Sequence, residues 1–489
     1  MASGRLAVRW VLSLVVACAA LALPAPGFTD PQGWSDDLRL TWTQPIARMS
    51  YNNANSVACD IFGNVHVVWT EEGDFYWYPY YVCRRAGGTD WTQPLCLSGD
   101  LCFSFYPAVA CDPWGNVHVV WCNYDMGPDI YYRKYDGASW GPIQRLTNDG
   151  YESWSPSIAA DGTGRVHVAW YDLRDGNEEI YYKQFDGVTW GPDERLTSAA
   201  KISWYPAIAA DTEGKVHVVW GDFRGSIWRI WYKRLDEASW SPDTALTVGS
   251  ADHPAIAVGG DDTVHLVWVD QRNANHEIYY KRLDASGWGG DLRLTATPGY
   301  SYNPSVAVDV EGNVHVAWYD NSDGDEEIYY RMCDGAGWGP IERLTNANGM
   351  SQFPSIATDD RGSVHLAWMD QRDGNIELYY KQRYDPASGL SVPDMPVGAP
   401  CLVRVSPNPA RSEVRLDFWQ ASAGPTSLVV ADIAGRVVWR DEAALVSPGW
   451  HSVTWTCRDS GGLAVAPGIY LTRIQAGTGI SRVKLVLTR

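Results

Sequence analysis

The stretch YESWSPSIAADGTGRVHVAWYDLRDGNEEIYYKQFDGVTWGPDERLT, residues 151–197, contains four short runs of strand-forming residues. The runs are PSIAAD, RVHVAW, EIYYKQF and WGPDERLT, linked by DGTG, DLRDGN and DG. β-Branched and aromatic residues favour strands, whereas Gly, Asp and Asn favour tight turns. Helical spacing of apolar residues is absent. The stretch therefore predicts four antiparallel strands joined by turns.

The same design recurs along the chain. The motif V-H-[VL]-x-W ends at Trp69, Trp121, Trp170, Trp220, Trp268, Trp318 and Trp368, with spacings of 52, 49, 50, 48, 50 and 50 residues. We number these repeats units 1 to 7. Four-stranded units of about 50 residues are typical of β-propeller blades. A solenoid would need end caps, and the sequence offers none.

Unit 7 lacks the W-x-x-x-x-R-L-T strand of the other units, and the missing strand stands before unit 1. GWSDDLRLT, residues 33–41, matches GWGGDLRLT, residues 287–295, at seven of nine positions. Unpaired edge strands are a liability in β proteins. We therefore predict an all-β fold in which residues 29–390 form a seven-bladed β-propeller, with residues 33–41 closing the last blade.

The first 28 residues predict a secretory signal peptide. Arg5 and Arg9 precede an apolar run from Trp10 to Leu23, and small residues follow it. Acylation at Cys18 is the alternative interpretation. The sequence thus favours a protein that is secreted or held at the outer surface of a bacterium, with no transmembrane segment after signal cleavage.

The charge balance excludes some partners. The formal net charge is -19 at pH 7, and a surface of that sign repels phosphate backbones. Nucleic acid is therefore not expected as a partner, and neither is an anionic membrane. The simpler interpretation, that the acidity keeps the surface soluble, stays open.

Cysteine usage suits an exported chain. Nine cysteines remain after Cys18, which favours disulfides with at least one free thiol. We predict pairs between Cys83 and Cys96 and between Cys401 and Cys457. Zinc-type spacing is absent, and no cofactor is predicted.

Two sets of motifs carry a family resemblance. The D-G-x-x-W segments at 136–140, 186–190 and 334–338 resemble the Asp-box, or BNR, hairpin of sialidase-like propellers. The phrase W-x-D-x-R-D-G-N-x-E-I-Y-Y is similar to the repeats of TolB-type propellers. Together these motifs cover residues 33–385, and the resemblance implies a propeller architecture rather than an activity.

The last part of the chain resembles another family. VSPNPARSEVRLDF, DIAGRVVWR, GWHSVTW and APGIYLTRI are similar to the C-terminal sorting domain of type IX secretion substrates and its FlgD-like immunoglobulin relatives. After a linker at residues 391–400, alternating strands and Pro/Gly turns in residues 401–489 also predict a small β-sandwich. The resemblance implies secretion machinery as a partner.

Features present in every unit are interpreted as architecture. Seven of ten histidines occupy one position of the second strand: His66, His118, His167, His217, His265, His315 and His365. A catalytic group is needed once or twice, whereas a packing group is needed in every blade. These histidines are therefore predicted to be structural.

Charged residues follow the strand Trp at fixed offsets. Asp172, Asp222, Asp270, Asp320 and Asp370 stand two residues after it, and Arg174, Arg224, Arg272 and Arg372 stand four residues after it. The sialidase resemblance implies an arginine cluster that grips a carboxylate. The alternative is an Arg–Asp pair bracing each loop. Asp320, Asp323 and Asp325 form either a calcium site or an acidic turn without metal.

Residues that vary between units point to a ligand site. Phe105, Trp154, Trp204 and Tyr302 stand two residues before the Pro of the first strand, and Tyr106, Tyr205, His253 and Phe353 stand one residue before it. These side chains should ring the central opening, on the same face as the Asp and Arg loops. Aromatic faces beside such groups can stack on sugar rings. The alternative is that they plug the centre.

These observations favour a non-catalytic propeller that binds an extracellular glycan or protein ligand. One alternative is a sialidase-type glycoside hydrolase or a polysaccharide lyase, which needs two converging carboxylates or a Tyr/Glu pair. Another is a protein-interaction scaffold.

Overall fold

We describe the protein from a computed structural model. It describes residues 31–383 and 403–487, with gaps at 32, 43–45, 51–54, 73–75, 87, 100, 102, 125–126, 237–238, 407–410, 412, 421–423, 433–435, 447–448, 460 and 477–478. The described residues are all-β, and none of their segments is a helix that could cross a membrane. The predicted signal peptide and linker lie outside these residues.

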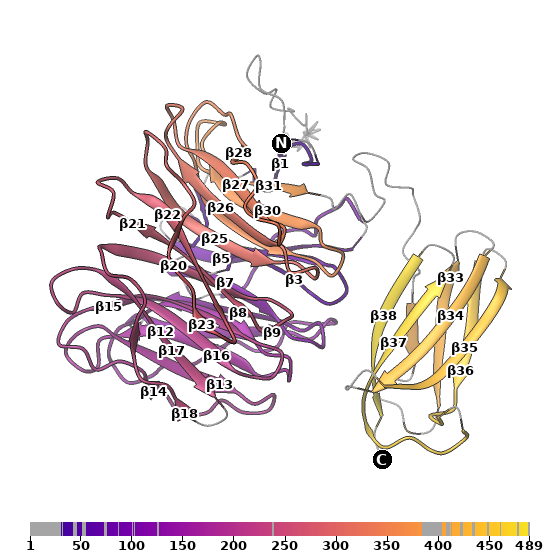
Figure 1. Cartoon of the computed structure of the whole chain (residues 1–489). Coiled ribbons are helices and arrows are strands. Elements are labelled where there is room, and N and C mark those ends of the chain that lie inside the picture. Colours follow the sequence, from indigo (N-terminus) through magenta and orange to yellow (C-terminus); the bar gives the residue numbers. More distant parts are fainter. Residues whose placement is uncertain are drawn as a thin grey trace, which may run out of the picture.

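Seven antiparallel sheets form, one for each predicted unit (Figure 1). The strands of unit 1 are β2 (Ala47–Arg48), β3 (Val57–Cys59), β4 (Val65–Glu72), β5 (Trp77–Arg84) and β6 (Leu95–Cys96). Unit 2 has β7 (Ser104–Cys111), β8 (Val117–Asn123), β9 (Asp129–Tyr135) and β10 (Gln144–Arg145). Unit 3 has β11 (Ser153–Ala160), β12 (Val166–Asp172), β13 (Glu179–Phe185) and β14 (Glu194–Arg195).

Units 4 and 5 have five strands each. They are β15 (Ser203–Ala210), β16 (Val216–Asp222), β17 (Arg229–Asp236), β18 (Ser239–Trp240) and β19 (Thr244–Ala245), then β20 (Ala251–Val258), β21 (Val264–Asp270), β22 (Glu277–Asp284), β23 (Gly287–Trp288) and β24 (Leu292–Arg293). Unit 6 has β25 (Ser301–Val308), β26 (Val314–Asp320), β27 (Glu327–Cys333) and β28 (Glu342–Arg343). Unit 7 has β29 (Ser351–Thr358), β30 (Val364–Asp370) and β31 (Glu377–Arg383).

The fourth strand of the unit 7 sheet comes from the other end of the chain. β1 (Leu38–Arg39) pairs antiparallel with β31, Leu38 opposite Tyr380 and Arg39 opposite Tyr379. The same register occurs inside unit 5, where Leu292 is opposite Tyr280. Figure 1 shows the indigo strand β1 beside the orange strand β31.

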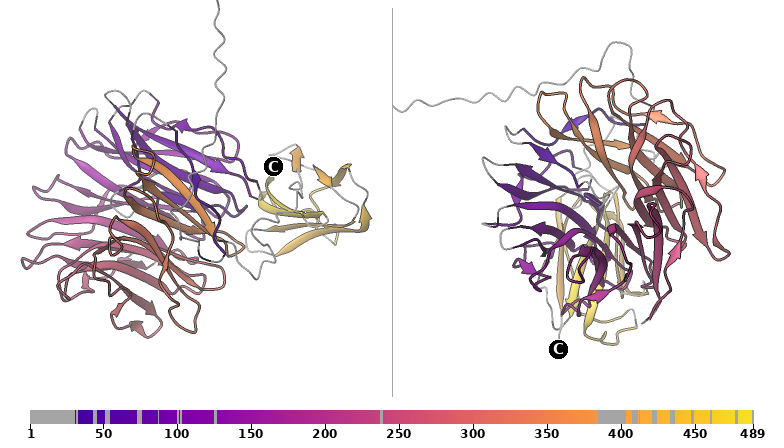
Figure 2. Two further views of the ribbon diagram at one scale, coloured as in Figure 1. Left: turned by 90° about the horizontal axis from the view of Figure 1, so that it is seen from above. Right: turned by 90° about the vertical axis from the view of Figure 1, so that its left-hand side faces the viewer.

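The sheets lie about a common axis, each of them a separate open sheet (Figure 2). The first strand of each unit is adjacent to the first strand of the next, and β29 is adjacent to β3. These strands line a narrow space of about 240 Å³, where Val, Ile and Ala side chains predominate. This arrangement is consistent with a β-propeller.

Aromatic side chains fill the interfaces between units. The seven motif tryptophans are fully buried. Tyr182 of unit 3 meets Trp240 of unit 4 edge to face, with ring centroids 5.0 Å apart, and Tyr232 meets Trp288 in the same way at 5.1 Å. Burying such large side chains contributes about 3 kcal/mol each. This repeated use of Trp and Tyr explains the unusual composition.

Residues 403–487 form two further sheets. One contains β32 (Val403–Ser406), β33 (Val414–Gln420) and β36 (Gly449–Trp455), and the other contains β34 (Gly424–Asp432), β35 (Val437–Val446), β37 (Gly468–Ala476) and β38 (Gly479–Leu487). Trp455, Leu428 and Ile474 pack in one apolar cluster between them. The predicted sandwich thus has its two sheets, whereas its role in sorting stays a prediction.

The predicted disulfide between Cys83 and Cys96 is wrong, since both residues carry free thiols. Cys96 is opposite Tyr80 in the register of β5 and β6, which leaves Cys83 three residues further along its strand. At about 3.3 Å per residue the two lie roughly 10 Å apart, beyond disulfide reach. Cys457 has a free thiol as well, and Cys401, its predicted partner, lies outside the described residues.

Candidate functional site

A backbone irregularity places the candidate site at the start of each first strand. In unit 3 the pairing register shifts between Trp154 and Ser157, and the same shift occurs in units 2 to 7. The residue before the Pro has a positive φ in each: Tyr106 (53°), Ser155 (51°), Tyr205 (50°), His253 (50°), Asn303 (46°) and Phe353 (52°). This conformation is costly before proline. The bulge interrupts the alternation of side chains between the two faces of the sheet, because two successive residues have no partner in the pairing register.

Aromatic contacts run through all seven units at this end of the strands. The ring pairs are Trp77–Phe105 (5.7 Å), Tyr106–Trp154 (6.4 Å), Tyr171–Trp204 (6.2 Å), Tyr205–His253 (5.3 Å), His253–Tyr302 (4.7 Å) and Tyr319–Phe353 (5.8 Å). We call these residues the aromatic rim. The structure thus brings together the predicted aromatic residues Phe105, Tyr106, Trp154, Trp204, Tyr205, Tyr302 and Phe353, most of them half-buried.

The aromatic rim is polar in unit 5. Asp252 and His253 occupy the two positions before the Pro there, with His253 Nδ1 3.2 Å from a carboxylate oxygen of Asp252. Tyr205 stacks on His253, and the Tyr302 ring is tilted against the same imidazole. His276 also contacts Tyr302, at 5.4 Å. Two of the three histidines outside the repeated position therefore lie together, beside groups that could bond sugar hydroxyls.

Unit 4 carries the largest aromatic cluster of the aromatic rim. Trp228 lies 5.5 Å from Trp204 and 5.3 Å from Phe223. Gly221 lies beneath this ring, since a Cβ at that position would be in van der Waals contact with Trp228, at 3.6 Å. The sequence analysis missed Phe223 and Trp228. Their signal was present, since most other units have Gln, Asn or Leu and Glu, Pro, His or Ile at these two positions.

The four predicted arginines lie on the same face but are held by carboxylates. Arg174 bonds Asp172 at 2.7 Å and Asp193 at 2.8 Å, and its guanidinium lies 4.2 Å from the ring centre of Tyr181. Arg224, Arg272 and Arg372 repeat this arrangement. The hydrogen bonds that Arg272 donates to Asp270 and Asp291 raise the pKa of its guanidinium. These contacts fit the brace interpretation, and ligand binding by these arginines stays a prediction.

The repeated histidines are buried in hydrogen-bonded networks. His167 lies 2.7 Å from the Tyr182 hydroxyl through Nδ1 and 3.2 Å from Asp161 through Nε2. Asp161 in turn accepts backbone N–H bonds from its own turn. Burial lowers the pKa of His217, and likewise of His265, to about 4. These two imidazoles are therefore uncharged at neutral pH and cannot serve as cationic ligand contacts.

The acidic turn of unit 6 has protein partners. Asp320 accepts hydrogen bonds from Ser301 and Thr297, and Asp323 accepts one from Tyr329. Asp325 does not join them in a cluster: across the described ranges, no three His, Cys, Asp or Glu side chains are arranged to hold a metal ion.

The opposite end of the central space has a cavity of about 280 Å³, lined in part by Cys59, Cys111, Asp112 and Asp161. Its carboxylates are occupied, because Asp112 bonds His118 and Asn116, and Asp161 bonds His167. The aromatic rim consists mostly of half-buried aromatic side chains that differ from unit to unit. We therefore take the aromatic rim as the candidate site.

A Tyr/Glu pair of the kind an enzyme would need does occur in unit 6. The Tyr300 hydroxyl donates to Glu326. Burial and this hydrogen bond raise the pKa of Tyr300 to about 12. A phenol with that pKa is protonated at neutral pH, and Glu326 is the base that would have to take its proton if Tyr300 acted as a nucleophile.

No protein-family model matches the chain, and no curated protein does. Solved structures match at low identity. The polysaccharide lyase Uly1 is 10% identical over 68% of this chain and 90% of its own, with a TM-score of 0.46. The Hadza microbial sialidase Hz136 is 12% identical over 66% and 74%, with a TM-score of 0.42. PorZ of Porphyromonas gingivalis, a surface component of the type IX secretion system, is 15% identical over 90% and 60%, with a TM-score of 0.41.

Proposed function

We propose that the protein is a secreted or surface-held seven-bladed propeller, closed by its N-terminal strand, that binds an extracellular glycan without catalysing its cleavage. The aromatic rim is the observation that carries this proposal. Its side chains lie where the first strands begin, differ from unit to unit and include His253, which pairs with Asp252. Stacking on sugar rings and bonding of hydroxyls need just these two kinds of group.

Trp204→Ala in the full chain should weaken binding to a recognised glycan about tenfold or more, because the substitution removes a half-buried stacking surface. Trp154→Ala should have a similar effect if the ligand spans units 3 and 4. The measurement is a glycan array followed by titration of each variant. Trp114→Ala is the matched control, since Trp114 lies in a turn at the opposite end of the central space and packs on Gly164.

Three outcomes would reject this site. They are no binding to any glycan, unchanged binding in both rim variants, and equal loss in Trp114→Ala. Turnover of a sialoside or a uronate polymer by the unmodified chain would instead support the enzyme alternative.

We further propose that residues 401–489 carry the propeller to the secretion machinery. The quoted motifs of this segment and its two sheets support this role. A chain that ends at Pro400 should accumulate inside the producing cell, whereas the full chain should reach the surface or the medium. Fractionation with an immunoblot measures this, and equal export of both chains would show that the segment is dispensable.

A further inference from the structure

Unit 4 differs from the other units in the charge of its second-to-third strand loop. Residues 222–229 contain Asp222, Arg224 and Arg229 and carry a net charge of +1. The equivalent loops of the other six units carry between -1 and -5, the most acidic being residues 320–327 of unit 6. A cationic loop is therefore unique to unit 4, in a protein whose net charge is -19.

The difference in charge arises because unit 4 lacks an ion pair that units 3, 5 and 6 have. In units 3, 5 and 6 the third strand begins with a buried glutamate that pairs with an arginine of the outer strand: Glu179–Arg195 (3.1 Å), Glu277–Arg293 (2.7 Å) and Glu327–Arg343 (2.8 Å). In unit 4 the glutamate is replaced by Arg229 and the arginine by Ala245. The carboxylate is lost, and a cation takes its position.

Arg229 has lost the partner that this position normally provides. The described residues include no hydrogen-bond partner for its buried Nε atom, and no carboxylate within ion-pair distance. The acids nearest along the sheet are already neutralised, since Arg224 pairs with Asp222 and Asp243, and Lys233 pairs with Asp243. The half-buried guanidinium of Arg229 can therefore bind an external anion.

The strand register puts this cation at the aromatic rim. Asp222 is opposite both Ser203 and Arg229, so Arg229 is level with the residue before Trp204. Trp228 precedes Arg229 in sequence and contacts Trp204. A second cation, the exposed Lys201, lies over the Phe223 ring at 5.2 Å. Unit 4 thus has a stacking surface and two cations at one end of its strands. Because successive residues of a strand point to opposite faces, Arg229 lies on the face of Ser203 and Asp222, and Trp204 lies on the other face.

We propose that unit 4 is the anion-recognising part of the aromatic rim, where Arg229, aided by Lys201, binds a carboxylate or sulfate group of a glycan that stacks another of its sugar rings on Trp204 and Trp228. This inference rests on the proposed function and narrows its ligand to acidic glycans. Planar guanidinium groups bind both kinds of anion, so the experiment includes each.

The test compares the full chain and its variants against galacturonate oligomers, sulfated galactose oligomers and neutral galactose oligomers. At least one acidic series should bind about tenfold more tightly than the neutral series, and its affinity should fall as salt is raised. Arg229→Gln should remove most of this preference and leave neutral binding unchanged. Arg165→Gln, which changes an exposed arginine at the opposite end of the strands, should have no effect.

A variant that restores the ion pair of the other units separates loss of the anion site from loss of the fold. Arg229→Glu combined with Ala245→Arg rebuilds the ion pair of units 3, 5 and 6, so it should keep the melting temperature and still lose the acidic preference. Equal binding of acidic and neutral series, or unchanged acidic binding in both variants, would overturn the anion site while leaving the aromatic rim proposal intact. If neither these series nor any glycan of the array binds, the proposed function itself fails.

Discussion

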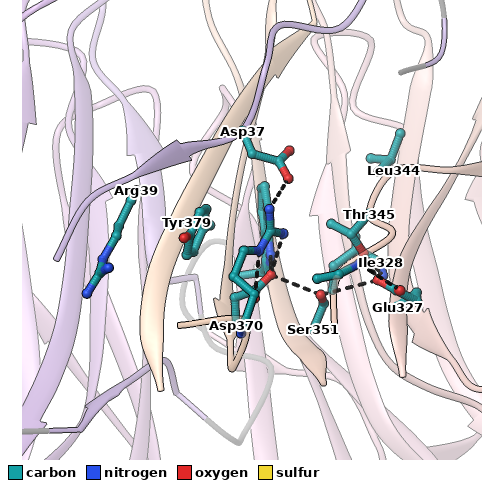
Figure 3. Close-up of polar contacts among 12 residues, drawn as sticks. Asp37, Arg39, Glu327, Ile328, Leu344, Thr345, Ser351, Asp370 and Tyr379 are labelled. Carbon is teal, nitrogen blue, oxygen red and sulfur yellow. Dashed lines mark hydrogen bonds and ion pairs between the residues drawn. The ribbon is translucent and has the colours of Figure 1, made fainter. Parts of the chain in front are cut away.

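A chain that begins at Ala47 should unfold at a temperature about 7 °C lower than one that begins at Thr29. The shorter chain loses the β1–β31 pairing, the buried Trp34 against Tyr330, and the ion pair between Arg39 and Glu377. Figure 3 shows how Asp37, on the segment before β1, reaches the loop of unit 7. Together these losses amount to about 5 kcal/mol, which corresponds to the stated shift in a domain of this size. Thermal unfolding followed by near-UV circular dichroism measures it.

A chain that begins at Gly33 is the matched control for this truncation. It keeps the whole segment 33–41, so it should melt like the chain that begins at Thr29. Equal melting of all three chains would show that the segment contributes nothing to stability and would overturn the proposed closure. A loss already present in the chain that begins at Gly33 would place the stabilising contacts before this segment.

The strands and their grouping into sheets could be predicted because equivalent residues recur at the same positions in every repeat. Each unit repeats VHxxW and YY at fixed offsets, so a missing strand is noticed when unit 7 lacks it. The register of Leu38 with Tyr380 is the one that the GWGGDLRLT match implies. Repetition thus allowed a contact between residues more than 300 positions apart to be predicted from local sequence.

Repetition also limited what could be predicted of the candidate site. The αL bulge before the Pro has no signature, because residues as different as Ser155, Tyr205 and Asn303 adopt it. Trp228 was missed because the comparison between units covered the first-strand positions and the Asp and Arg that follow the second strand, and left out the residue before the third strand. The wrong disulfide arose in unit 1, where a hairpin was predicted without the register that sets Cys96 opposite Tyr80.

Asp37→Ala should destabilise the protein by about 3–5 kcal/mol, because it leaves buried charge without its partner. The Lys381 ammonium is fully buried, 2.9 Å from Asp37 and 2.9 Å from the carbonyl oxygen of Leu344. Arg372 bonds the other Asp37 oxygen at 2.6 Å. Unit 5 supplies the control, since Asp291 pairs in the same way with Arg272 and Lys281. Denaturant unfolding of each variant measures the free energy of unfolding.

The side chain of Lys281 is 12% exposed and that of Lys381 is not exposed at all, so water can solvate the first lysine but not the second. Asp291→Ala should therefore cost only about 1–2 kcal/mol. Adding Lys381→Met to Asp37→Ala should restore part of the loss, because a buried apolar chain replaces an unpaired ammonium. If the two substitutions instead add their separate costs, or if Asp37→Ala and Asp291→Ala are equally mild, the buried pair does not hold the N-terminal segment to unit 7.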